Sequence, residues 1–117
     1  MELKLKALSD YANVSSDGKL NIIGVFDSIN PKTLPAILPH MYLVLVYDAA
    51  AAEAGVKRNV RIILADADGN QMLSLEQPIV VPQPPRPGAR AEVKQILGLN
   101  AVKFNKSGDY QFSVLVG

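Results

Sequence analysis

The sequence has no cysteine among its 117 residues, which excludes disulfide bonds, thiolate metal ligands and thiol nucleophiles. This absence fits a reducing compartment, and we expect a cytoplasmic protein. Histidine is also scarce, because His40 is the only one. A transition-metal site needs further His or Cys ligands, and a serine nucleophile needs a positioned base, so neither chemistry has its partners here. We interpret His40 as a loop residue.

Motifs for catalysis and for cofactor binding are missing as well. The sequence has no Gly-x-Ser-x-Gly nucleophile motif and no glycine-rich loop of the kinds that bind phosphate. We therefore predict that the protein is not an enzyme and carries no cofactor.

Charge of one sign is not in excess. Twelve Lys and Arg residues against eleven Asp and Glu residues leave a net charge of +1, and the basic residues are scattered. Neither a nucleic acid nor a membrane surface is favoured as a partner. The chain has no run of roughly 20 apolar residues, which a membrane helix needs. It also has no apolar core of the kind found in signal peptides. We expect residues 1–117 to form a single domain.

Alternating hydrophobicity and turn residues divide the chain into extended segments. In Glu2–Leu8, the apolar residues Leu3, Leu5 and Ala7 alternate with charged ones, as in a half-buried strand. Asp68-Gly69 lies between two apolar runs and predicts a hairpin. The predicted strands are Glu2–Leu8, 19–29, Met41–Asp48, one on each side of Asp68-Gly69, 91–104 and a last one from Tyr110.

Seven strands without a persuasive helix predict an all-β fold, an antiparallel β-sandwich of about seven strands and of immunoglobulin-like type. The alanine-rich stretch 49–54 favours a connecting loop, with one short helix as the variant. Prolines make 30–40 and 81–90 irregular connections. We interpret Pro82–Pro87 as a stiff crossing loop and Tyr110 as a residue of the core edge.

The second and third predicted strands are apolar on both faces, whereas a strand with one face in water is expected to alternate. If Leu20, Ile22 and Phe26 face the core, the pleat turns Ile23 and Val25 outward. In the same way, if Met41, Leu43 and Leu45 face the core, Tyr42, Val44 and Val46 face outward. The predicted interface therefore consists of Ile23, Val25, Tyr42, Val44 and Val46.

Three arrangements account for this outer apolar surface. A β-bulge at Gly24 reverses the alternation of its strand. Alternatively, the loop in 31–40 folds back and lays Leu34, Ile37 and Leu38 over the outer face. A second copy of the protein covers the face in a two-fold dimer. The sequence leaves all three open.

Acidic residues offer a second, different hypothesis. Asp66 and Asp68 lie in "DADGN", which superficially resembles a calcium loop, but its glycine and the twelfth position, Gln77, do not fit the helix–loop–helix pattern. A plain hairpin turn is favoured. The alternative to an assembly module is a calcium- or small-molecule-binding domain that uses acidic end loops.

The order of short motifs resembles a family of small uncharacterised bacterial proteins, a domain of unknown function. The motifs are "DYA" at 10–12, "GKLNIIG" at 18–24, "DADG" at 66–69 and "FNKSGDYQF" at 104–112. The resemblance implies bacterial origin, an all-β domain and no assigned activity. It directs attention to Asp10, Tyr11 and Asn21, polar residues that flank the first connection, as a hydrogen-bonded corner or a ligand contact.

Overall fold

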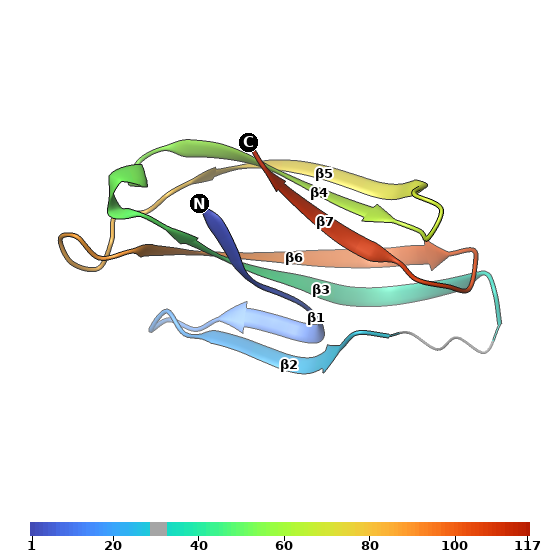
Figure 1. Cartoon of the computed structure of the whole chain (residues 1–117). Helices are drawn as coiled ribbons and strands as arrows, with labels where there is room; N and C mark the ends of the chain where they lie inside the picture. The colour runs from blue at the N-terminus through green and yellow to red at the C-terminus, as the bar shows by residue number, and fades with distance from the viewer. Residues whose placement is uncertain (29–32) are drawn as a thin grey trace. The chain divides into compact units, whose positions relative to one another are not determined.

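A computed structural model describes residues 1–28 and 33–117. The described chain forms seven strands and one short 3-10 helix (Figure 1). In chain order these are β1 Glu2–Val14, β2 Leu20–Phe26, β3 Ala36–Ala49, η1 Ala51–Glu53, β4 Lys57–Ala65, β5 Gln71–Val80, β6 Ala91–Phe104 and β7 Gln111–Val116. Within the described ranges, no helix is long and apolar enough to cross a membrane.

The strands form two antiparallel sheets, with the orders β2-β1-β3-β6 and β5-β4-β7. The predicted all-β fold of about seven strands is confirmed, and the division into two sheets is that of a β-sandwich. In an immunoglobulin constant domain the first, second, fifth and fourth strands share one sheet. The immunoglobulin-like comparison therefore holds for the number of strands and sheets, not for the strand order.

Two compact units follow from this division. One comprises residues 2–48 and 93–106 and holds the four-stranded sheet; the other comprises Met1, 49–92 and 107–117 and holds the three-stranded sheet. The single domain expected for 1–117 stays a prediction.

The three-stranded sheet agrees with its local sequence pattern. Asp68-Gly69 lies in the turn between β4 and β5, as predicted. Buried Val60, Ile62 and Leu64 alternate along β4 with more exposed residues. Phe112, Val114 and Val116 pair with Leu64, Ile62 and Val60, so these three residues of β7 share one face.

The odd-numbered residues of β3 form one of the buried rows of the four-stranded sheet. Met41, Leu43 and Leu45 are each at most 1% exposed. Tyr47 follows in the same alternation, and its hydroxyl donates a hydrogen bond to Oε1 of Gln95 on β6 at 2.7 Å. A buried polar pair of this kind is stable because each group finds its partner away from water.

Two strands of this sheet differ from the predicted ones. The pairing of β1 with β3 shifts register between Leu3 and Leu5, so Leu3 lies opposite Tyr47 and Leu5 opposite Val46. Tyr47 and Val46 face opposite sides of β3. The prediction that Leu3 and Leu5 share one face is therefore wrong, because a bulge separates them.

The third strand begins at Ala36, five residues earlier than predicted. Its register with β1 ends at the pair Ser9 and Tyr42, so Pro39 lies in a stretch that extends past β1. His40 belongs to this stretch, and its interpretation as a loop residue is wrong. Ile29, predicted to end the second strand, lies outside the described residues, as do 30–32.

Candidate binding surface

The predicted interface residues divide into two groups. Ile23 and Val25 on β2 are 63% and 65% exposed, and Tyr42 on β3 is partly exposed. Val44 and Val46 are 0% and 5% exposed. Both lie within the chain's own packing and offer no surface to a partner, so the outer face of β3 does not supply the interface that the alternation predicts.

The strand pairing explains why the two valines of β3 are covered. Val44 lies opposite Ala7 of β1, and Val46 lies opposite Leu5. Because β3 has neighbours on both sides in the order β2-β1-β3-β6, its outward side chains pack between those of two other strands. Of the described strands only β1 lies beside β2 in the sheet, so the outward side chains of β2 have no second flanking strand within residues 1–28 and 33–117.

Gly24 does not reverse the alternation of β2. The pairing of β1 with β2 keeps one register from Leu8 opposite Phe26 to Val14 opposite Leu20. Ser9 pairs with Val25 on one side and with Tyr42 on the other, which places these three residues on one face. Of the three alternatives that the sequence left open, the bulge at Gly24 is therefore wrong.

The connection before β3 does not cover this face either, as far as it is described. Ile23 and Val25 remain exposed, and two residues proposed to cover them, Leu34 and Ile37, are themselves 42% and 61% exposed. Residues 29–32 of the connection lie outside the described residues. Over residues 33–40, the predicted covering by the loop is wrong.

An aromatic cluster borders the exposed pair. The ring of Tyr42 makes edge-to-face contacts with Tyr11 on β1, at 5.5 Å between centroids, and with His40, at 4.7 Å. Nδ1 of His40 lies 2.8 Å from Oδ1 of Asn100 on β6, a hydrogen bond across 60 residues of sequence. Tyr11 lies opposite Ile23, so the cluster is continuous with β2.

Gly98 of β6 lies beside the Tyr42 ring. A β-carbon at Gly98 would stand 3.4 Å from Cε1 of Tyr42, at the short limit of ordinary van der Waals contact. Ala101, next to Asn100, has a φ of 55°, a left-handed conformation that residues other than glycine rarely adopt. The sequence showed no signal for Asn100, because its partner is distant and a lone asparagine has many uses.

The polar residues of the first connection serve its own turn. Asn21 Nδ2 lies at hydrogen-bond distance, 3.5 Å, from the carbonyl oxygen of Lys19. Ser15 donates from its hydroxyl to the Asp17 carboxylate and lies 3.1 Å from the same carbonyl. The Ser15 bond holds the pKa of Asp17 below its usual value. Asp10 lies against Gly24, and Tyr11 belongs to the aromatic cluster.

Asp66 and Asp68 lie in the β4–β5 turn of the other sheet. The Asp66 carboxylate accepts hydrogen bonds from the backbone N–H groups of Asp68 and Asn70, at 3.0 and 2.9 Å, and lies 3.3 Å from Asn70 Nδ2. The plain hairpin turn is confirmed. In residues 1–28 and 33–117, no group of three or more metal-ligating side chains comes together.

Comparison with known proteins places most of the chain within one family model. The model is described as a family of unknown function, DUF6941, and it matches residues 4–117. No curated protein and no solved structure matches the chain.

Proposed function

The chain belongs to the DUF6941 family, which has no known function, and we propose that it is a non-catalytic assembly module that self-associates through one sheet face. The face consists of Tyr11, Ile23 and Val25, which we call the β1–β2 face. One observation carries the proposal: two branched apolar side chains, each more than 60% exposed, lie on one face of the β1–β2 pair. Exposed apolar patches commonly mark protein-binding surfaces.

The energetics favour an association of modest strength. Full burial of an Ile or Val side chain contributes about 1.5–3 kcal/mol, and a symmetric dimer buries each residue twice. Association itself costs on the order of 4–15 kcal/mol of translational and rotational freedom. The two sums are comparable, so we expect a dimer that dissociates on dilution.

The tyrosine of the β1–β2 face supports a protein partner. Tyr11 is 44% exposed, and its ring is held at the edge of the Tyr42 ring. Tyrosines are enriched in protein interfaces because they combine apolar area with a hydroxyl that hydrogen-bonds at the rim.

Calcium or small-molecule binding stays a prediction, as do the bacterial origin and the cytoplasmic location.

Sedimentation equilibrium over a range of concentrations tests the proposal. We expect wild type to dimerise with rising concentration and Val25→Lys to remain a monomer, because a lysine there places a charge in the contact. Leu115→Lys is the control, since Leu115 is 52% exposed on β7 of the other sheet. A wild-type monomer at millimolar concentration contradicts the proposal, and so does equal dimerisation of all three proteins.

A further inference from the structure

Among the described strands, β2 forms an edge of the four-stranded sheet and pairs with β1 alone. We propose that two copies of the chain join by antiparallel pairing of β2 with β2 about a two-fold axis at Ile23, so that the sheet continues from one copy into the next. This inference rests on the proposed self-association and gives it a geometry.

Hydrogen bonding within the hairpin determines which groups of β2 face outward. The N–H of Ser15 donates to the carbonyl oxygen of Lys19 at 2.8 Å. From this bond to the pair of Tyr11 and Ile23 the register of β1 and β2 is continuous, so alternate residues exchange such bonds and Asn21 and Ile23 direct their backbone groups to β1. Leu20 and Ile22 direct their N–H and C=O groups to the outer edge.

Antiparallel pairing about Ile23 places Leu20 of one copy opposite Phe26 of the second and Ile22 opposite Gly24. The outward N–H and C=O groups of Leu20 and Ile22 then face the edge of the second copy.

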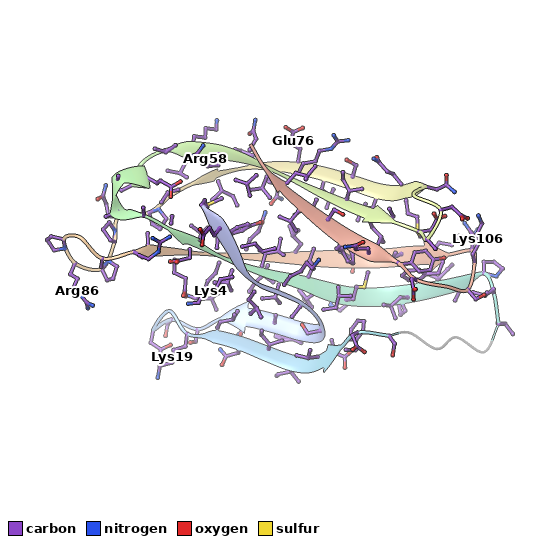
Figure 2. The ribbon with its side chains drawn as sticks, viewed as in Figure 1. Lys4, Lys19, Arg58, Glu76, Arg86 and Lys106 are labelled. Atoms are coloured by element: carbon purple, nitrogen blue, oxygen red, sulfur yellow. The ribbon has the colours of Figure 1, made fainter. Side chains whose placement is uncertain are left out.

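Charge selects the register of this pairing. Lys19 lies four residues before Ile23, and Asp27 lies four residues after it. Pairing about Ile23 places Lys19 of one copy opposite Asp27 of the other, at both ends of the contact. Any slip along the strands moves both pairs out of alignment. Lys19 extends from the β1–β2 turn (Figure 2), is largely exposed, and has a surface ion pair with Asp17 at 3.6 Å.

Side chains on the β1–β2 face agree with the same register. Ile23 meets Ile23 of the second copy on the axis, where directly opposed residues that do not exchange backbone bonds approach most closely. Val25 lies opposite Asn21 of the second copy, which continues the apolar contact toward the rim. The outer face proposed for association and the paired edge are then parts of one interface.

The edge also lacks the features that keep sheet edges apart. Natural edge strands carry charged residues or proline. Leu20–Phe26, all of it described, carries neither. At the other edge of the same sheet, β6 carries Glu92, Lys94 and Lys103. Pairing along β2 is therefore favoured over pairing along β6.

Cysteine cross-linking tests the axis, because the chain has no native thiol. In the proposed dimer the Cα atoms of the two residues at position 23 lie about 4.5 Å apart, within the range of a disulfide. At position 25 they lie about 13 Å apart along the strands, beyond that range. We expect Ile23→Cys to form a disulfide-linked dimer at a rate on the order of tenfold higher than Val25→Cys.

A charge exchange tests the register. We expect Lys19→Asp and Asp27→Lys each to weaken dimerisation, and the double variant to restore it, all measured by sedimentation. A wild-type dimer with equal cross-linking at 23 and 25, or without restoration by the double variant, overturns the edge pairing and leaves the proposed function standing. A wild type that stays monomeric overturns both.

Discussion

The carboxylate of Asp10 lies directly against Gly24, and a β-carbon at position 24 would stand 2.9 Å from Asp10 Cγ. Gly24 also has a φ of 72°, in the left-handed region that favours glycine. The glycine that interrupts the apolar run of β2 is therefore required by a close approach across the hairpin and by its backbone conformation. The register of β1 with β2 is the same on both sides of this glycine.

Gly24→Ala is expected to lower the free energy of unfolding by about 2 kcal/mol or more, from the positive φ and the contact with Asp10. Gly18→Ala is the control: its φ is 84°, but a β-carbon there meets open space among the described atoms, so it costs only about 1 kcal/mol. Urea denaturation measures both. If adding Asp10→Ala fails to recover part of the Gly24→Ala loss, the contact is not responsible.

Val44→Lys is expected to destabilise the fold by about 3 kcal/mol or more, because Val44 is fully buried and a charge there is desolvated. Val25→Lys is expected to change the stability of the monomer by no more than about 0.5 kcal/mol, because Val25 is exposed. Thermal and urea unfolding of dilute samples compare the two. Equal stabilities contradict the placement of Val44 inside the packing.

Burial raises the pKa of Tyr47 to about 12, from an ordinary value of 10.0. The folded state therefore resists ionisation of this phenol. Its contribution to stability is fully present below pH 10 and is lost as the pH rises from 10 toward 12. We expect wild type to lose more stability than Tyr47→Phe over that interval. At neutral pH, Tyr47→Phe is expected to cost about 1 kcal/mol through the lost bond to Gln95. If the free energies of unfolding of the two proteins fall in parallel between pH 10 and 12, the raised pKa of Tyr47 does not cause the loss.

The carboxylate of Glu53 binds the N-terminal ammonium group, and this contact depends on the pH. The Met1 ammonium donates to Oε1 of Glu53 at 2.9 Å, and the Ala50 N–H donates to Oε2 at 3.0 Å. Arg58 Nη2 lies 3.1 Å from the same Oε1. Chiefly through the ammonium, these groups lower the pKa of Glu53 from 4.5 to about 2.

Because the pKa of Glu53 is lower in the folded state, its contribution is present above pH 4.5 and is lost as the pH falls toward 2. We expect wild type to lose stability over this interval more steeply than Glu53→Gln, which keeps the shape but not the charge. Urea unfolding between pH 2 and 6 measures the difference. The same slope in both proteins would show that Glu53 does not carry the acid dependence.

Local features of the chain were sufficient for much of the fold. Alternation and turn residues located seven strands, and Ala91–Phe104 was predicted with the bounds that the structure has. The hairpin at Asp68-Gly69 was predictable because its turn chemistry lies within a few residues. The apolar excess on β2 was also correctly recognised, since Ile23 and Val25 are exposed.

Features that depend on neighbouring strands were not predictable in this way. The bulge in β1 turns Leu3 and Leu5 to opposite faces, although their alternation looks regular. Val44 and Val25 look alike in sequence, yet one is buried and the other exposed. His40 and Asn100 have no local signal that they meet.

The sequence by itself determined the strands, their turns and the surplus of apolar side chains, because these depend on residue type and on spacing of a few positions. Only the tertiary structure decided which part of that surplus stays exposed. Burial of an outward side chain depends on how many strands flank its own, and strand order arises from contacts between residues far apart in the chain.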